Sequence, residues 1–210
     1  MNFEPEMIFV QGGTFLMGSP ESEAGRWNDE RQHEVTLHDF YIGKYPVTQA
    51  QWVAVMGNNP SHFKGDDLPV ENVSWNDTQE FIQKLNDLTG KAYRLPTEAE
   101  WEFAARGGTQ SKGYLYAGSD DLNEVAWWYK NSNSRTRPVG RKKPNELGLH
   151  DMSGNVWQWC NDWYGDYPAE PQINPTGPDS GGYRVIRGGS WINVAQHCRS
   201  ALRYDREPTY

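Results

Sequence analysis

The sequence has few cysteines, no long apolar run and no excess of basic residues. Its two cysteines, Cys160 and Cys198, cannot form a disulfide framework and allow one bridge at most. The first residues, MNFEPEMIFV, lack the basic start and long apolar run of a signal peptide, and no other window is long and apolar enough to span a membrane. We therefore expect no membrane insertion and a soluble chain, cytoplasmic as synthesised. A virion or cell-surface destination would need another route.

Charge and aromatic content narrow the class of protein further. A net charge of −8 argues against nucleic acid as a partner, because duplex binding needs clustered lysine and arginine. Hydrophobic residues make up only 36% of the chain, yet ten Trp, eleven Tyr and seven Phe supply enough apolar area for a core. The length of 210 residues fits a single domain, residues 1–210.

Local patterns predict short elements joined by ordered loops. Two β-prone runs in MIFVQGGTFLMGS predict a hairpin, and HEVTLHDFYIG predicts a further strand. Helices are predicted in VTQAQWVAVMG, SWNDTQEFIQKLNDLTG and LPTEAEWEFAARGG, with Thr48, Ser74 and Thr97 as N-caps. The stretch 107–190 is rich in loops and tryptophan, and long ordered loops often carry function.

Several stretches together resemble the formylglycine-generating enzyme (sulfatase-modifying factor) family. They are GGTFLMGS, YPVTQAQW, LPVENVSWNDTQEF, YRLPTEAEWEFAARGG, NELGLHDMSGNVWQWCNDWYG and RVIRGGSW, in the order that the family has them. The resemblance implies an α+β, C-type-lectin-like fold of that type, with little regular secondary structure and long ordered loops. It does not fix the function, since one fold can carry unrelated sites.

One branch of that family consists of oxidases, which convert a cysteine of a client sulfatase to formylglycine with copper held by two thiolates. Aligning the C-terminal segment with this branch puts Asn193 and Cys198 at the two thiolate positions. Asparagine cannot replace a thiolate on Cu(I), so the pair is incomplete. A sulfatase-modifying oxidoreductase is therefore the alternative function, and a fixed structural or interaction domain is another.

A second branch, the variable proteins of diversity-generating retroelements, resembles the segment 187–210 more closely. In that branch, altered copying of adenines changes Asn codons into codons for other residues, so the segment becomes hypervariable. The frame of the branch is kept here at Trp191, Ala195, Gln196, Cys198, Arg199, Ser200, Ala201, Arg203, Glu207, Pro208 and Thr209. Asn, or a residue reachable from an Asn codon in this way, stands at Ile192, Asn193, Val194, His197, Leu202, Tyr204, Asp205, Arg206 and Tyr210.

These candidate variable positions mix aromatic, apolar and charged side chains, as adaptable binding surfaces do. The resemblance implies that they form one exposed face of a non-catalytic protein, which recognises a protein or cell-surface ligand. For Ile192, Val194 and Leu202 the alternative is ordinary core.

The resemblance also implies a calcium site in DMSGNVWQW, although the interpretation as a binding protein requires no cofactor. Its ligands would be Asp151, Gly154, Val156 and Gln158. Gln158 supplies an oxygen without the negative charge that calcium favours, and a simple turn at Gly154 is the alternative. The family pattern continues beyond EPTY with a closing strand, so we expect an unpaired sheet edge here.

Overall fold

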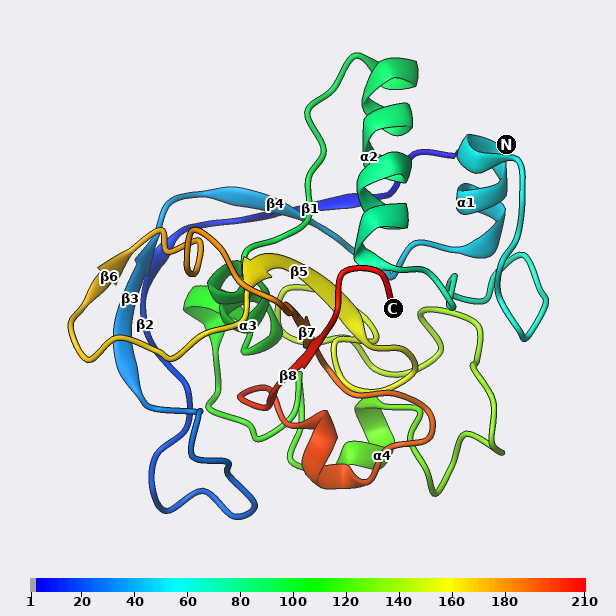
Figure 1. The fold of residues 1–210 in the computed structure, drawn as a ribbon. Coiled ribbons are helices and arrows are strands. Elements are labelled where there is room, and N and C mark those ends of the chain that lie inside the picture. The colour runs from blue at the N-terminus through cyan, green and yellow to red at the C-terminus, as the bar shows by residue number, and fades with distance from the viewer. Residues whose placement is uncertain (1–2) are drawn as a thin grey trace.

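The computed structural model describes residues 3–210 (Figure 1). The helices are α1 (Gln49–Met56), α2 (Trp75–Thr89), α3 (Glu98–Ala105) and α4 (Leu122–Val125), with the 3₁₀ turns η1 (Gly108–Gln110) and η2 (Ala195–Cys198). The strands are β1 (Met7–Val10), β2 (Gly13–Met17), β3 (His33–Leu37), β4 (Phe40–Gly43), β5 (Gln158–Trp163), β6 (Gln172–Ile173), β7 (Arg184–Arg187) and β8 (Arg203–Arg206). Much of the remaining chain forms long loops, as expected.

The three helices predicted from the sequence are present and begin at the predicted caps. Thr48, Ser74 and Thr97 each accept a hydrogen bond from the third residue of their helix, whose own side chain bonds back to the cap. Such reciprocal capping satisfies two of the backbone N–H groups that a helix start leaves without partners. Gly57 and Gly90 end α1 and α2 in the left-handed conformation.

The predicted hairpin between β1 and β2 is wrong. These strands pair instead with β4 and β3, with Met7 opposite Gly43 at one end and Met17 opposite His33 at the other. Both pairs share one register, so they form a single antiparallel ribbon that is interrupted at Gly12. There the N–H donates to Asp39 Oδ1 (2.8 Å), and a Cβ would lie 2.3 Å from the carbonyl oxygen of Leu37. Glycine at position 12 thus allows two segments of the backbone to approach closely, and it does not mark a turn between β1 and β2.

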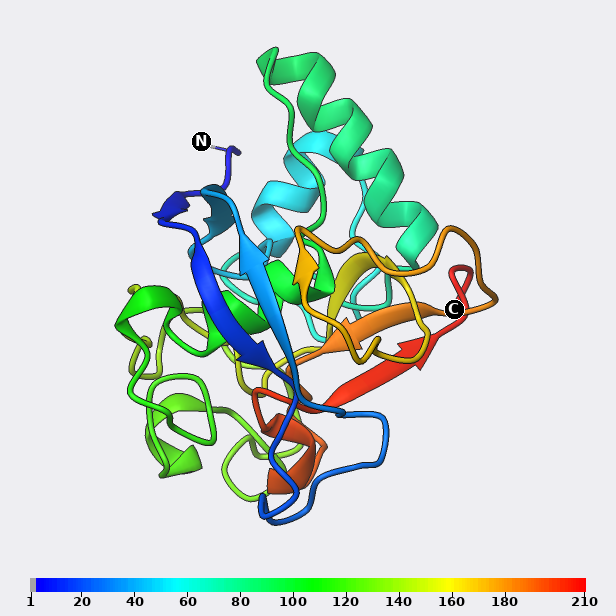
Figure 2. The same cartoon turned by 90° about the vertical axis from the view of Figure 1, so that its left-hand side faces the viewer.

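The second sheet carries the C-terminal segment. Its order is β5-β7-β8, with both pairs antiparallel, and Figure 2 shows β7 and β8 lying side by side. β8 pairs with β7 alone within the described residues, so it forms an edge, as expected. The end of the chain folds back toward α2, where the N–H of Asn76 donates to the carbonyl of Pro208 (3.1 Å).

Helix α3 lies at the centre of the molecule, and every residue from Glu98 to Ala105 is buried. Its apolar residues pack with the ribbon strands and with β5 and β7 in the main core, where Trp101 and Phe103 are the largest side chains. A separate apolar cluster joins α1 to α2 through stacked Trp52 and Phe81 rings. The three acids of α3 are buried as well, and two of them, Glu98 and Glu102, pair with arginines of the C-terminal segment.

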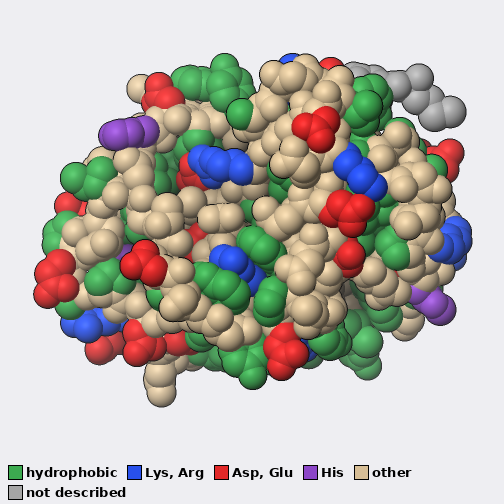
Figure 3. Space-filling view, turned by 45° about the horizontal axis from the view of Figure 1, so that its top comes forward, with side chains coloured by type: hydrophobic (Ala, Val, Ile, Leu, Met, Phe, Trp, Pro, Cys, Tyr) green, Lys and Arg blue, Asp and Glu red, His purple; other side chains and the backbone are tan. Residues whose placement is uncertain are grey.

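No helix in the described part of the chain is long and apolar enough to cross a bilayer. On the face drawn in Figure 3, lysine and arginine side chains are scattered among acidic and apolar ones. No continuous basic surface of the kind that follows a nucleic-acid backbone appears among the described residues on that face.

Candidate binding surface

The C-terminal segment contains a buried part of the frame and several accessible candidate variable residues, while Gln196, Glu207 and Thr209 of the frame are exposed. Cys198 through Ala201 and Arg203, all members of the predicted frame, are at most 2% exposed. Ile192, Val194 and Tyr210 are 58%, 49% and 76% exposed. The segment is therefore anchored by residues other than those predicted to vary.

Buried ion pairs provide most of that anchoring. Arg187 on β7 bridges two acids of α3, at 2.6 Å from Glu98 Oε1 and 2.6 Å from Glu102 Oε2. Arg203 on β8 forms a second pair with Glu98 through Nε (2.7 Å) and Nη2 (2.9 Å). Burial alone would raise the pKa of Glu98, but the charges of Arg203 and Arg187 lower it to about 2. Glu98 is thus ionised at neutral pH and joins both strands to α3.

The RGGSW turn that precedes the variable positions requires its glycines. Gly189 has φ of +72°, and a Cβ there would lie 2.8 Å from the carbonyl oxygen of His197. Gly188 has φ of +92° and packs against the Trp101 ring. Only glycine fits such a close approach in the left-handed conformation. The turn therefore holds the start of the variable segment against η2 and the core.

A surface groove of about 1040 Å³ lies next to this turn. Four of the predicted variable residues line it, namely Ile192, Asn193, Arg206 and Tyr210. The other lining residues are His62, Phe63, Val70, Glu71, Asn72, Val73, Ser74, Asp77, Val156, Trp157, Trp159, Ile186, Ser190, Trp191 and Thr209. Only these four lining residues, which we call the variable wall, are thus predicted to vary, and the other lining residues form the fixed walls.

The fixed walls are aromatic and held in place by their own contacts. Phe63 meets Trp191 edge to face at 5.6 Å between ring centroids, and the Arg135 guanidinium lies 5.4 Å from the Phe63 ring. Trp159 donates its Nε1–H to the carbonyl of Val73 (3.0 Å). Ordered aromatic side chains offer large contact areas at a low cost in conformational entropy.

A second group of variable residues lies against the loop between β2 and β3. His197 contacts Trp27 edge to face at 5.7 Å, and Tyr204 contacts the same ring at 5.9 Å. Tyr204 also contacts Trp157 at 5.6 Å, which connects this group to the groove. Burial and the nearby Arg199 charge lower the pKa of His197, so this imidazole is neutral at physiological pH.

Two predicted positions do not belong to this face. Leu202 is fully buried, at 0% exposed, so its assignment to an exposed binding face is wrong and the core alternative holds. It follows the buried run Cys198–Ala201 and directly precedes β8. Burial of its apolar side chain away from water stabilises the folded state. Asp205 alternates with Tyr204 along β8 and so points to the opposite side of the strand, where its charge acts on Tyr164.

We define the variable face as Ile192, Asn193, Val194, His197, Tyr204, Arg206 and Tyr210. The sequence did not indicate which residues would surround it. His62, Phe63 and Trp27 come from loops far from residue 187 in the sequence, and no periodic pattern links them to the C-terminal segment. The only signal was the concentration of aromatic residues in long loops.

The two positions aligned with copper thiolates have other roles. Cys198 packs in a cluster with Tyr116 and Trp128, and burial raises the pKa of its thiol to about 12. Asn193 accepts a hydrogen bond from Ser190 Oγ (2.6 Å) and lies 3.0 Å from His197 Nδ1. Cys160 is buried as well, and neither cysteine forms a disulfide. The thiol chemistry needed to bind Cu(I) is therefore poorly supported here.

The residues aligned with calcium ligands form a hydrogen-bonded turn. The Asp151 carboxylate accepts from the N–H of Gly140 (2.8 Å) and from Asn155 Nδ2 (3.4 Å). The Gln158 amide accepts from Trp101 Nε1 (2.9 Å) and donates to the carbonyl of Asp151 (2.7 Å). Gly154, with φ of +76°, donates its N–H to Gly188, and Val156 is buried beside it. Protein donors thus reach both Asp151 carboxylate oxygens and the Gln158 side-chain oxygen, and the aligned residues carry one carboxylate only.

We predict that calcium does not stabilise the protein, because calcium sites normally supply six to eight free oxygens and more negative charge. The melting temperatures measured in excess calcium and in excess chelator should agree within about 1 °C, because an ion that does not bind the folded protein cannot stabilise it. Magnesium at the same concentration is the control for ionic strength. A rise specific to calcium, removed by Asp151→Asn, would show instead that this turn opens to bind the ion.

Comparison with known proteins places this architecture in a family. Residues 2–210 match the sulfatase-modifying factor enzyme 1-like domain. The chain is 35% identical to chaperone protein LppX of Paenibacillus barcinonensis, over 90% of this chain and 79% of that protein. It is 39% identical to the formylglycine-generating enzyme of Streptomyces coelicolor over 67% of this chain, which spans about half (48%) of that enzyme.

A solved structure of Treponema denticola variable protein 1 superposes with a TM-score of 0.88 at 34% identity, covering 96% of this chain and 89% of that one. The α+β architecture with long ordered loops is therefore the C-type-lectin-like fold of the formylglycine-generating enzyme type. Relatives with such different names share one scaffold, so the scaffold alone does not identify an activity. The chain belongs to the sulfatase-modifying factor (formylglycine-generating enzyme) family and resembles its variable proteins in structure.

Proposed function

We propose that this chain is a non-catalytic ligand-binding protein whose variable face is diversified by a retroelement. The observation that carries the proposal is the difference in burial between the frame residues from Cys198 to Ala201 with Arg203 and the accessible residues of the variable face. Frame residues Arg199 and Arg203 are buried in ion pairs, whereas Ile192, Val194 and Tyr210 are about half exposed or more. A surface that accepts many side chains needs a scaffold that does not depend on them.

The groove gives such a surface a place to hold a protein ligand. Its fixed aromatic wall supplies contact area, and the variable wall places one cation, Arg206, between the rings of Tyr204 (4.9 Å) and Tyr210 (5.0 Å). Arg206 forms no ion pair with another described residue, so its charge is free to meet an acidic group. Aromatic and arginine side chains are the residues that most often dominate binding energy at interfaces.

The oxidoreductase alternative has weaker support. Cys198 is fully buried with a strongly raised thiol pKa, and the second thiolate position is occupied by Asn193. A fixed interaction domain would use the same groove without diversification. Sequencing the DNA around the gene separates the two. A near-copy of the last segment, with Asn codons at the variable positions and beside a reverse transcriptase gene, would support diversification, and its absence would favour a fixed domain.

Replacing the seven residues of the variable face together should change ligand choice but not folding. We expect the free energy of unfolding to change by about 1 kcal/mol or less for each exposed position, since these side chains contribute little to the core. The test is a displayed library randomised at the variable face and selected against a fixed panel of immobilised proteins. Binders with different specificities should emerge while most members stay folded.

The matched control is a library randomised at exposed sheet positions outside the groove, Leu16, Glu34, Tyr41 and Ile173. It should stay folded and yield far fewer binders. Equal yields from the two libraries would contradict a dedicated binding face. Widespread unfolding of the first library would show that the variable residues belong to the core.

A further inference from the structure

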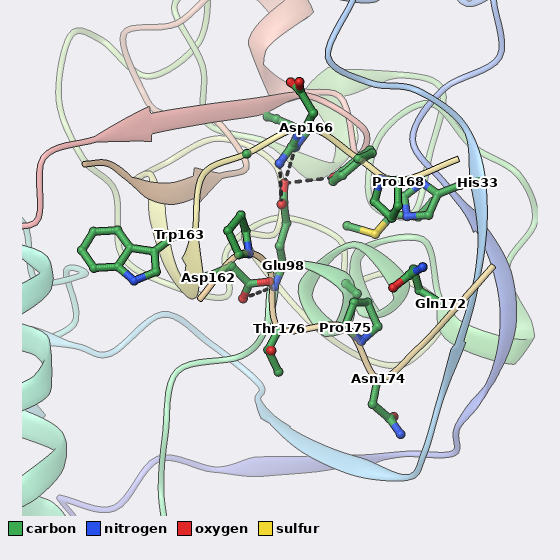
Figure 4. Close-up of a pocket in the computed structure, with 17 residues that line it drawn as sticks. His33, Glu98, Asp162, Trp163, Asp166, Pro168, Gln172, Asn174, Pro175 and Thr176 are labelled. Carbon is green, nitrogen blue, oxygen red and sulfur yellow. Dashed lines mark hydrogen bonds and ion pairs between the residues drawn. The ribbon is translucent and has the colours of Figure 1, made fainter. Parts of the chain in front are cut away.

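A cavity of about 350 Å³ (Figure 4) shares no lining residue with the groove. α3 contributes Glu98 to its wall, β5 contributes Asp162 and Trp163, and β8 contributes Arg203. The loop around β6 closes the rest, with Thr176 and Gly177 among its lining residues. No residue of the variable face lines this cavity, so whatever it binds does not depend on the proposed function.

One buried carboxylate that lines this cavity, that of Asp162, has an oxygen without a hydrogen-bond partner among the described residues. The buried acids of the described chain are Glu30, Glu98, Glu100, Glu102, Asp151 and Asp162. The four glutamates are paired with arginine, and hydrogen-bond donors reach both oxygens of Asp151. Asp162 Oδ2 accepts the backbone N–H of Glu98 (2.9 Å), but no hydrogen bond or ion pair reaches its Oδ1 within the described residues.

The cavity is the place where that oxygen can be reached. Asp162 is only 3% exposed, and it lines the cavity beside the Gly177 turn, where a Cβ would lie 3.2 Å from Oδ1. Figure 4 shows its side chain beside the Glu98 backbone, with Thr176 nearby and the Trp163 ring directed away from it. An ionised carboxylate buried without a counter-charge is costly, so a cation that enters the cavity would remove that cost.

We propose that this cavity is a binding site for a primary ammonium group carried on a short unbranched hydrocarbon chain, with Asp162 as its counter-ion. The ammonium donates a hydrogen bond to Oδ1. The hydrocarbon chain packs along Pro175 and Pro178, which line the same cavity.

The chemistry of the cavity favours this ligand class over other cations. A guanidinium prefers two carboxylate oxygens in a fork, and here Oδ2 already accepts the Glu98 N–H. A divalent metal needs several hard ligands, and no cluster of three acidic, His or Cys side chains able to hold a metal occurs among the described residues. An ammonium is a compact charge that can use a single oxygen.

The charged groups around Asp162 set how binding depends on pH. Burial and the charge of Glu98 raise the pKa of Asp162 to about 7, with Glu100 adding to the rise and Arg203 opposing it. Arg94, Arg184 and Cys160 also interact electrostatically with Asp162, while His33 and Asp166 line the cavity. The ionised fraction of a carboxyl with this pKa falls about tenfold from pH 8 to pH 6. An alkylammonium keeps its charge over that range, because its pKa resembles that of lysine.

The experiment titrates the whole protein with n-butylammonium chloride at constant ionic strength. The readout is the backbone amide of Glu98 by NMR, because it donates to Asp162 directly. We expect a saturable shift with a dissociation constant of roughly 1–10 mM at pH 8 and about tenfold weaker binding at pH 6. Tetramethylammonium, which has the same charge but no N–H, should give no saturable shift. A capped lysine that binds as well would identify a protein side chain as the source of the ammonium, and failure of that arm alone would point to a small free amine.

Two variants complete the test. Asp162→Asn should weaken n-butylammonium binding at least tenfold. Asp166→Asn, which removes an exposed charge lining the same cavity, should change it by less than about twofold. Equal binding by Asp162→Asn and the wild type, equal binding of tetramethylammonium, or no saturable shift of the wild type up to about 50 mM would each overturn the proposal. The comparison of the two ammonium ions needs no variant, so misfolding of a variant would not leave the result open.

Discussion

Replacing Arg187 with alanine should destabilise the protein by about 3–5 kcal/mol. Arg187 is 0% exposed and is paired with Glu98 and Glu102 at 2.6 Å each, so its loss leaves buried carboxylates short of positive charge. It also donates to the carbonyl of Ser200 (2.7 Å), which ties β7 to the buried frame of the C-terminal segment. Urea unfolding at pH 7 measures the change.

The control for Arg187 is Arg206→Ala, an arginine at the other end of the same strand pair that lies in the groove. It should alter the free energy of unfolding by less than about 1 kcal/mol, because it has no buried ionic partner. Similar losses in the two variants would mean that the buried network contributes no more to stability than an accessible cation does. The scaffold would then depend on packing alone.

Asp162→Asn should stabilise the protein at pH 8, by about 2–4 kcal/mol. Burial raises the pKa of Asp162 to about 7 in the folded state, so the folded protein binds this proton more tightly than the unfolded chain does. Stability therefore falls as pH rises from about 4 to about 7, and the full penalty persists above pH 7. The asparagine has no charge to desolvate, so the variant should lose this part of the pH dependence.

Glu98 should produce the opposite slope at lower pH. Its pKa is lowered to about 2, against burial, by Arg203 and Arg187, so its contribution is complete above about pH 4.5 and is lost as pH falls toward 2. Wild type should thus be most stable near pH 4–5, and Asp162→Asn should extend that plateau to pH 8. Denaturant unfolding from pH 3 to pH 9 measures both slopes. A wild-type stability that rises between pH 5 and pH 8 would contradict the assignment of Asp162.

Local signals in the sequence predicted local structure well. The reciprocal pairs of Thr97 with Glu100 and of Ser74 with Asp77 act within one turn of helix, so spacing alone reveals them. The prediction of a β1–β2 hairpin was wrong because Gly12 permits close approach to the backbone near Asp39. Sequence spacing does not distinguish a glycine needed for such an approach from a glycine in a turn.

The accessible positions of the candidate face were predicted in part, through resemblance rather than through spacing. The codon pattern selected Leu202 and Asp205 together with residues that do reach the surface. A codon pattern carries no information about burial at Leu202 or about the side of β8 on which Asp205 lies. The walls from Phe63 and Trp27 were not predicted, since they meet the C-terminal segment only after the loops fold. Asp162 lay within a motif that carried the family resemblance and no assigned role, and only the count of its hydrogen-bond partners set it apart.

If the C-terminal segment is diversified as proposed, the burial of Leu202 limits how many of the resulting variants can fold. If position 202 is mutated as freely as its neighbours, each round of copying places charged or bulky residues in a space that holds one leucine, and those chains should fail to fold. Natural siblings should then carry leucine or another residue of similar volume and polarity at 202, while positions 192 and 194 range freely. Cellular proteases would thus degrade a constant fraction of the newly diversified variants, those with an unsuitable residue at position 202, before these could bind any ligand.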